Sequence, residues 1–214
     1  MQPRVVGGYE WQSAEKVTEY LDREKEPERE AEFRAAHQQM LDLLPFTAGA
    51  TFEFLDLGAG AGAVSASLME RFPKARGVLA DMSAPMMQAG GERLAPFSGR
   101  YRYVALDMNG DVWPAELAGP FGAVVSARAI HHLPNDRKLA VFQHVYERLA
   151  PGGVFINWDI HRDLERELTD PGNVHNRTAA SVDEHLDMLR STGFESVQHI
   201  QREKRRAIFF AVKR

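Results

Sequence analysis

Residues 53–62 read EFLDLGAGAG, an apolar run that ends in three glycines within five positions. The apolar residues predict a buried strand, and the glycines predict a turn whose backbone a ligand can approach closely. A helix that follows such a turn directs its unpaired N–H groups at the same ligand. The stretch therefore predicts the first strand and the ligand-binding turn of a doubly wound α/β sheet.

From Thr51 onward, short apolar runs alternate with helical patterns, which is typical of a mostly parallel sheet with helices on both faces. The last two runs, GFESVQHI and RAIFFAVK, are joined by the short turn QREK. They must pair antiparallel, because a parallel connection needs a crossover of a dozen or more residues. Strands are also predicted at 75–81, 101–106, 123–127 and 153–159, and helices at 63–72, 84–95, 136–149 and 181–192.

Residues 1–48 are predicted to form a helical segment that covers the substrate, ahead of a sheet domain at 49–214. Two helices are expected in this segment, parted near Glu26-Pro27, because proline disfavours helix at the residue before it. Phe33, Met40 and Leu44 fit one face of the second helix. The charged residues nearby are interpreted as its solvated surface.

The composition excludes several classes of function. The formal net charge of −4 gives no general attraction to nucleic acid or to an anionic membrane. No long apolar stretch and no signal-peptide pattern are present, so we expect a cytoplasmic protein with no membrane partner. The chain has no cysteine, which excludes disulfides and thiolate metal sites, and no histidine spacing indicates a metal site.

Two cofactors fit the glycine turn. Residues 58–63 satisfy the dinucleotide pattern G-x-G-x-x-[GA], and Asp81 lies about 20 residues further on, as that pattern requires. A nicotinamide-dependent oxidoreductase is therefore one interpretation. The pattern is weak by itself, because any nucleoside-binding sheet of this kind needs glycines and an acid at these places.

More of the chain resembles the class I methyltransferases that use S-adenosylmethionine (SAM), in particular the small-molecule group with the HHL motif. The motifs LDLGAGAG, LADMSAPMM, ALDM, AVVSARAIHHL and LAPGG follow one another in the order of that family. The C-terminal hairpin is also a family feature. The resemblance implies a seven-stranded sheet of order 3-2-1-4-5-7-6 and SAM as the cofactor.

The resemblance also assigns cofactor-binding residues. Asp56 would hold the ammonium group of SAM, Asp81 would accept both ribose hydroxyls, and Asp107 would accept from the adenine amine. Two structural alternatives stay open: Asp81 as a helix cap, and Asp107 as a turn residue before Asn109-Gly110. The full predicted cofactor set is Asp56, Gly58, Ala59, Gly60, Gly62, Asp81, Met82, Met86, Asp107, Met108 and Ser126.

The HHL motif supplies the first catalytic candidate. We prefer His131 as the base and interpret His132 as structural, because neighbouring side chains tend to diverge. The related mycolic-acid cyclopropane synthases carry a pocket-facing acid at the position of His131. Asp159 and His161, two apart at the end of a strand, form a second acid–base candidate pair on one face. A packing role for both histidines of the motif remains the alternative.

The predicted partner is a small-molecule methyl acceptor, with no nucleic acid, and the oligomeric state is left open, a homodimer included. Arg128 is a candidate for a substrate carboxylate or phosphate, with a solvent-facing arginine as the alternative. The predicted substrate-binding residues are Trp11, Tyr20, Arg128, His175 and Arg177. The predicted reaction is methyl transfer from SAM to an O, N or C atom. The alternatives are the oxidoreductase and a non-catalytic SAM-binding regulatory subunit.

Overall fold

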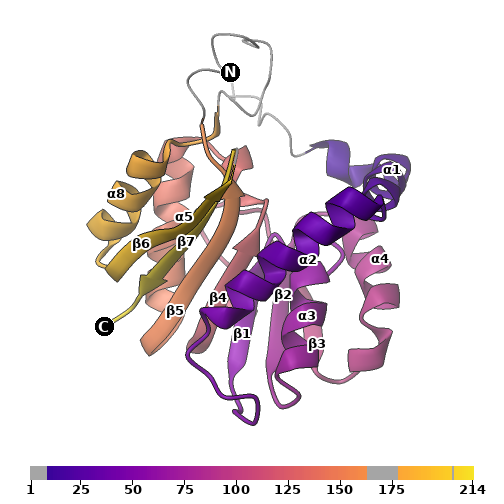
Figure 1. The fold of residues 1–214 in the computed structure, drawn as a ribbon, viewed down its shortest axis with the longest axis horizontal. Coiled ribbons are helices and arrows are strands. Elements are labelled where there is room, and N and C mark those ends of the chain that lie inside the picture. Colours follow the sequence, from indigo (N-terminus) through magenta and orange to yellow (C-terminus); the bar gives the residue numbers. More distant parts are fainter. Residues whose placement is uncertain (1–8, 163–177, 204) are drawn as a thin grey trace.

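The computed structural model describes residues 9–162, 178–203 and 205–214. Seven strands form one sheet in the order β3-β2-β1-β4-β5-β7-β6 (Figure 1). The predicted sheet order is confirmed. The strands are β1 Glu53–Leu57, β2 Arg76–Asp81, β3 Tyr101–Ala105, β4 Phe121–Ala127, β5 Leu149–Ile160, β6 Glu195–Glu203 and β7 Arg206–Val212.

The first five strands pair parallel, and β7 pairs antiparallel with both β5 and β6. Two boundaries differ from the sequence prediction. β5 begins at Leu149, which pairs with Phe121, and β6 continues to Glu203, which pairs with Arg206. Most of the predicted turn QREK therefore belongs to β6, because its residues continue the hydrogen-bonded ladder with β7.

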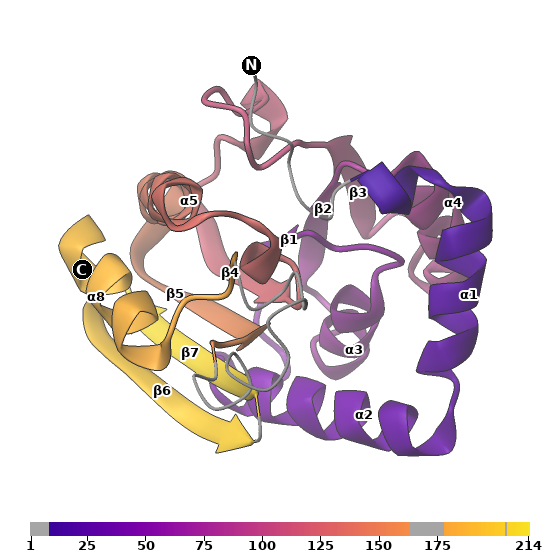
Figure 2. The ribbon, with the colours of Figure 1, turned by 90° about the horizontal axis from the view of Figure 1, so that it is seen from above.

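Helices cover both faces of the sheet (Figure 2). Side chains alternate along each strand. Leu55 and Leu57 pack in one core cluster with α5 and α8, whereas Phe54 packs in a second cluster with α2 and α3. The helices are α1 Ala14–Glu24, α2 Pro27–Asp42, α3 Ala63–Arg71, α4 Ala84–Arg93, α5 Asn135–Arg148 and α8 Val182–Thr192. Short 3₁₀ turns lie at η1 Tyr9–Gln12, η2 Ala95–Phe97, η3 Ala115–Leu117 and η4 Ile130–His132.

The two N-terminal helices part at Pro27, which occupies the first turn of α2, as predicted. α2 buries Phe33 and Met40 against the sheet domain. The buried residue of α1 is Val17, which packs with Ala61 and Met86 in a small separate cluster. Figure 2 shows α1 and α2 running along two sides of α3, so that both helices approach the turn that precedes α3.

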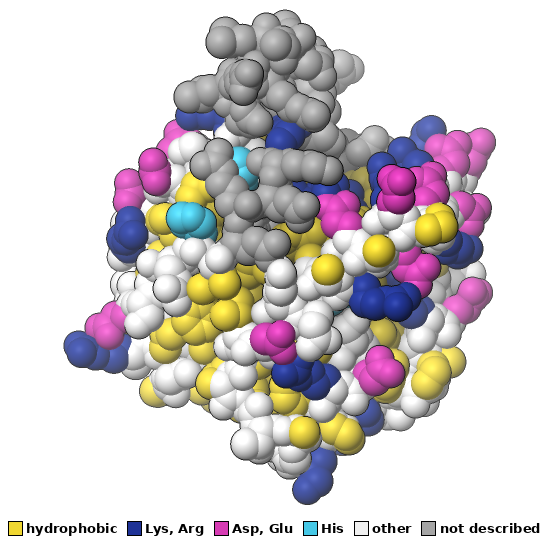
Figure 3. All heavy atoms as spheres, in the orientation of Figure 1, with side chains coloured by type: hydrophobic (Ala, Val, Ile, Leu, Met, Phe, Trp, Pro, Cys, Tyr) yellow, Lys and Arg dark blue, Asp and Glu magenta, His cyan; other side chains and the backbone are white. Residues whose placement is uncertain are grey.

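The described surface carries charges of both signs. On the face drawn in Figure 3, Lys and Arg side chains are interspersed with Asp and Glu side chains, and the described residues there form no continuous basic patch. No helix among the described residues has the length and apolar character needed to span a membrane.

Candidate functional site

A cavity of about 450 Å³ lies at the carboxyl ends of β1, β2 and β4. The strand order reverses between β1 and β4, and ligands of doubly wound sheets bind at that place. The walls also include α1 and α2, so segments far apart in the sequence enclose one space. The residues that line it and matter below are Trp11, Tyr20, Phe33, His37, Asp56, Gly58, Ala59, Gly60, Asp81, Met82, Met86, Asp107, Met108, Arg128, His131, His132 and Trp158.

The glycine turn brings its backbone to the cavity wall at Gly58, Ala59 and Gly60. Gly58 has a φ of +66°, and a Cβ atom there would lie 2.2 Å from the Cβ of Ala129. Only glycine fits this position. Gly62 is the N-cap of α3 and is not among the lining residues. The structure therefore does not place Gly62 in contact with this cavity, where its sequence prediction as a cofactor-binding residue would require it.

Two carboxylates from neighbouring strands flank the turn. Asp56 lies one residue before the end of β1, almost fully buried, and accepts a hydrogen bond of 2.6 Å from the Ser65 hydroxyl. Burial raises the pKa of Asp56 to about 7, against the opposing effect of the Ser65 bond. Asp81 ends β2 and accepts from the backbone N–H groups of Gly60 at 2.7 Å and Ser83 at 2.8 Å. Burial raises its pKa as well.

Asp81 is not the cap of the helix that follows it. The N-cap of α4 is Ser83, whose hydroxyl accepts from the N–H of Met86. Asp107 lines the cavity and also accepts from the backbone N–H of Asn109 at 2.9 Å. It is therefore both available to a ligand and the turn residue that the sequence offers as an alternative.

The three predicted methionines line the cavity, whereas the predicted serine does not. Met82, Met86 and Met108 are among the lining residues. Ser126 is fully buried, and its hydroxyl donates to the carbonyl of Leu57 at 2.8 Å, between β4 and β1. Its side chain therefore holds two strands together at the carboxyl edge and does not line the cavity.

His131 and Asp159 form a buried pair at the cavity wall. The Nδ1 atom of His131 lies 2.6 Å from Oδ1 of Asp159, and the backbone N–H of His131 donates to Oδ2 at 2.9 Å. Burial by itself raises the pKa of Asp159, but the charge and hydrogen bond of His131 lower it below the usual range. When the ring is neutral and its Nδ1–H is donated to Asp159, Nε2 is the atom that carries the lone pair.

The sequence predicts Asp159 and His161 as an acid–base pair near the pocket, and the structure does not place them so. Asp159 pairs with His131, and neither Asp159 nor His161 is among the lining residues. Side chains alternate along β5, so Trp158 and Ile160 face the cavity and Asp159 faces η4 instead. The strand ends at Ile160, and the backbone N–H of His161 donates to the carbonyl of Arg205.

Behind Asp159, a buried polar group of side chains extends to α8. The Asn157 amide lies 3.4 Å from Asp159 and 3.4 Å from Nε2 of His185. Burial lowers the pKa of His185 to about 3, and its ring stacks on Phe209 with centroids 3.8 Å apart. His185 is therefore neutral near pH 7.

His132 also lines the cavity, contrary to the expectation that the two histidine side chains diverge. Their ring centroids are 4.0 Å apart, because both lie in the tight 3₁₀ turn η4. The His132 ring also lies edge-on to Trp11, at 6.5 Å between centroids.

The N-terminal segment contributes Trp11 and Tyr20 to the cavity wall. The carbonyl of Trp11 accepts from the Ser83 hydroxyl, and the Gln12 amide donates to the Met82 carbonyl at 2.9 Å. These bonds hold η1 against the loop after β2. The predicted substrate residues His175 and Arg177 lie outside the described residues.

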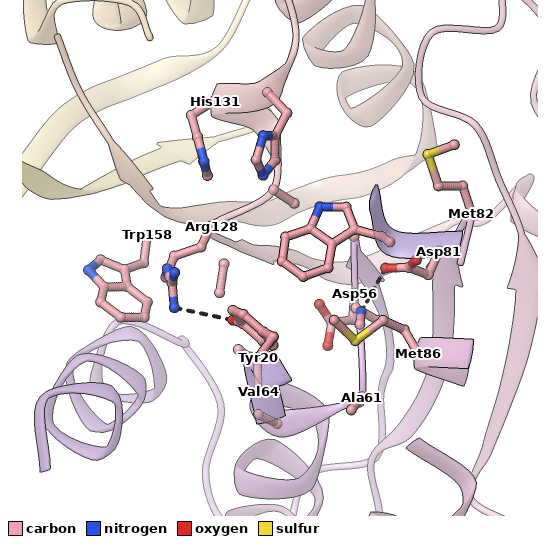
Figure 4. Close-up of a pocket in the computed structure, with 18 of the residues that line it drawn as sticks. Tyr20, Asp56, Ala61, Val64, Asp81, Met82, Met86, Arg128, His131 and Trp158 are labelled. Carbon is pink, nitrogen blue, oxygen red and sulfur yellow. Dashed lines mark hydrogen bonds between the residues drawn. The ribbon is translucent and has the colours of Figure 1, made fainter. Parts of the chain in front are cut away.

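Arg128 faces the cavity, so the interpretation as a solvent-facing arginine is wrong. Its NH1 group donates to the Tyr20 hydroxyl at 3.2 Å (Figure 4). Sequence reasoning missed Phe33, His37 and Trp158 as lining residues. Phe33 and His37 share the face of α2 that the sequence predicts to be buried, and Trp158 adjoins the predicted Asp159, so their spacing was the available signal.

Comparison with known proteins gives a consistent picture. The family model described as "Methyltransferase domain" matches residues 54–153. Over 102 residues, the chain is 34% identical to trans-aconitate 2-methyltransferase of Deinococcus radiodurans, covering 48% of this chain and 35% of that protein.

Two solved structures share the fold. PigF with SAH superposes with a TM-score of 0.73 at 17% identity, covering 99% of this chain and 63% of that one. Human N-acetylserotonin methyltransferase in complex with SAM superposes with a TM-score of 0.72 at 17% identity, covering 100% and 60%.

The chain thus spans about a third of the first curated relative that it matches and less than two thirds of both solved structures. The matched residues hold the glycine turn, Asp56, Asp81 and His131, which are the elements that the sequence motifs single out. By these residues and by its sheet order, the segment 54–153 is similar to the methyltransferase domains that its family model describes, and the chain has the fold of the SAH-bound and SAM-bound structures above.

Proposed function

We propose that this chain transfers the methyl group of SAM to an O, N or C atom of a small molecule, by in-line displacement. The observation that carries the proposal is one cavity whose wall brings together the glycine turn, the carboxylates of Asp56 and Asp81, and His131 with its partner Asp159 behind it. The glycine turn and the two carboxylates suit a cofactor, and the histidine–aspartate pair suits an acceptor that must lose a proton.

The residues of the cavity fit the chemistry of SAM. Bound SAM supplies an activated methyl group on a sulfonium. Asp56 offers a buried carboxylate for an ammonium group, and Asp81 offers one for a ribose diol. Met82 and Met86 offer adaptable apolar surface for a ring.

On the acceptor side, this chain's own contribution is mainly alignment and exclusion of water. Alignment of two reactants lowers a barrier by roughly 7–11 kcal/mol in favourable cases. Trp11, Tyr20 and Phe33 wall the cavity and restrict the size of what enters. His131, with Nδ1 bound to Asp159, would accept the proton of a hydroxyl or amine at Nε2.

The acceptor's identity is open to screening guided by the relatives. The proteins that this chain resembles are named for trans-aconitate and N-acetylserotonin. Both compounds belong in an acceptor panel of phenols, amines and carboxylic acids, scored by transfer of a radiolabelled methyl group from SAM.

The test of the cofactor is calorimetric titration of the purified chain with S-adenosylhomocysteine (SAH), and in parallel with NADH and NADPH. We expect micromolar binding of SAH and no binding of either nicotinamide nucleotide. Binding of a nicotinamide nucleotide alone would favour the oxidoreductase and overturn the proposal. SAH binding without methyl transfer to any member of a broad acceptor panel would favour the regulatory subunit.

A further inference from the structure

Arg128 is held in an unusual conformation directly after β4. Its φ is +57°, and among the described residues only Ser196 is another non-glycine residue with positive φ. Such a conformation is strained for a side-chain-bearing residue and clusters at functional sites. The backbone N–H of Arg128 donates to the carbonyl of Trp158 at 2.8 Å, which holds the strained residue against β5.

This backbone conformation directs the guanidinium into the cavity, between aromatic rings. Its carbon lies 4.7 Å from the centroid of Phe33 and 5.6 Å from that of Tyr20. In Figure 4, Arg128 and Trp158 lie on one side of the cavity, and Asp81 and Met82 lie on the other. The cationic group therefore sits away from the carboxylate predicted to bind the ribose.

The guanidinium has unused hydrogen-bonding capacity. Within the described part of the chain, Tyr20 is its hydrogen-bond partner through NH1, and no carboxylate forms an ion pair with it. The Nε atom is shielded from solvent and has no partner among the described residues. The nearby carboxylate of Glu24 binds Arg93 at 3.2 Å instead. A partly buried cation without an anion favours an anionic ligand, and the planar fork of arginine suits a carboxylate.

The surroundings of Arg128 favour the acceptor over the cofactor as the source of that carboxylate. Tyr20, Phe33, His37 and Trp158 lie outside residues 54–153, which match the methyltransferase family model. Arg128 itself lies within residues 54–153, so its neighbours, and not its own position, set this end of the cavity apart from the matched segment. SAM also has a carboxylate, so the experiment must separate the two sources.

We propose that Arg128 binds a carboxylate of the methyl acceptor, whose apolar part packs against Phe33 and Trp158. The proposal rests on the proposed function and names the class of substrate: a small carboxylic acid with an apolar or aromatic body.

The test uses matched pairs of carboxylates and carboxamides: benzoate and benzamide, trans-cinnamate and cinnamamide, glutarate and glutaramide. Each is titrated calorimetrically into the protein, with and without saturating SAH. In at least one pair we expect the carboxylate to bind more tightly than its amide by about tenfold or more, as for a hydrogen-bonded charge.

Two variants at the same strained backbone position serve as matched controls. Arg128→Met retains an unbranched apolar side chain but removes the charge. Arg128→Lys retains the charge but removes the planar guanidinium group that can bind both oxygens of a carboxylate. We expect Arg128→Met to abolish the preference for the carboxylate and leave amide binding unchanged. Arg128→Lys should keep part of the preference.

SAH and 5′-methylthioadenosine, which lacks the amino-acid part, separate the two sources of a carboxylate. If Arg128→Met weakened SAH but not 5′-methylthioadenosine, the arginine would serve the cofactor and the proposal would be overturned. No preference for any carboxylate in the wild-type chain would also overturn it. Failure of SAH to bind is a different result, which overturns the proposed function, and the titrations without SAH still measure the anion preference.

Discussion

Nδ1 of His131 lies 2.6 Å from Oδ1 of Asp159, although the two residues are 28 positions apart in the sequence. The second carboxylate oxygen of Asp159 accepts the backbone N–H of His131 at 2.9 Å. The carboxylate therefore fixes the backbone and the ring of the same residue. We therefore expect Asp159 to act as a positioning residue, because its contact with the cavity is through His131.

Asp159→Asn should lower turnover by at least about tenfold, because an orienting carboxylate stabilises the imidazolium that forms when the base takes a proton. SAH affinity should not change, since Asp159 does not line the cavity. The measurements are the steady-state kinetics with an acceptor found in the screen and calorimetry with SAH.

A double-mutant cycle with His131→Ala separates positioning from general destabilisation. If Asp159 acts through His131, the double variant should be no slower than His131→Ala alone. Additive losses, or undiminished turnover in His131→Ala, would contradict the assignment and leave His131 with a packing role.

Asp81→Ala should weaken SAH binding by at least about tenfold, because it removes a partly buried acceptor for two ribose hydroxyls. It also removes the acceptor of the Gly60 N–H, so the glycine turn loses one of its anchors. Asp111→Ala is the matched control, since Asp111 is exposed and binds Arg137 by an ion pair. Equal affinity in wild type and Asp81→Ala would remove Asp81 from the cofactor site.

SAH affinity should rise with pH until Asp56 is ionised. Burial raises the pKa of Asp56 to about 7, so below that pH the carboxyl must release a proton before it binds an ammonium group. Affinity should then fall by up to about tenfold per pH unit below the pKa, with proton release on binding. Calorimetry between pH 5.5 and 7.5, in buffers of different ionisation enthalpy, measures both quantities.

Two variants sharpen this pH prediction. Asp56→Asn should bind SAH with little dependence on pH. Ser65→Ala removes the hydrogen bond that lowers the pKa of Asp56, so the pH midpoint should move upward. A midpoint unchanged in Ser65→Ala would show that another group causes the dependence.

The folded state should lose stability in acid because of buried neutral histidines. Burial lowers the pKa of His185 to about 3 and that of His37 to about 4, below the ordinary value of 6.5. The unfolded chain therefore binds more protons than the folded chain below pH 6.5. Each histidine lowers the free energy of unfolding by about 1.4 kcal/mol per pH unit as the pH falls from 6.5 towards its folded-state pKa.

His185→Phe should reduce that slope, and His199→Gln, an exposed strand position, should not. Phenylalanine suits the site because the His185 ring already stacks on Phe209 and lies against Phe142 at a tilt. Urea denaturation at pH 7, 6 and 5 gives the slopes. Equal slopes in wild type and His185→Phe would mean that His185 is not the group that titrates.

Much of the fold could be predicted from local sequence features. The apolar run before Gly58, the break at Pro27 and the short link between the last two strands each restrict the chain through backbone conformation or chain length. Such constraints act over a few residues and are readable without knowledge of packing. The start of β5 at Leu149 and the end of β6 at Glu203 could not be predicted in this way, because hydrogen bonds to a neighbouring strand extend each strand beyond its apolar run.

The sequence by itself determined the turn at 58–62 and the positions of Asp56 and Asp81 at or near the ends of their strands, since strand periodicity and glycine conformation encode these locally. The sheet order was predicted from the family resemblance and not from any local pattern. Only the tertiary structure decided which side chains of the site bind one another. Asp159 joins His131 rather than His161, and Arg128 meets Tyr20 across 108 positions of sequence. Side-chain directions at strand ends depend on which elements pack there, and no local pattern carries that information.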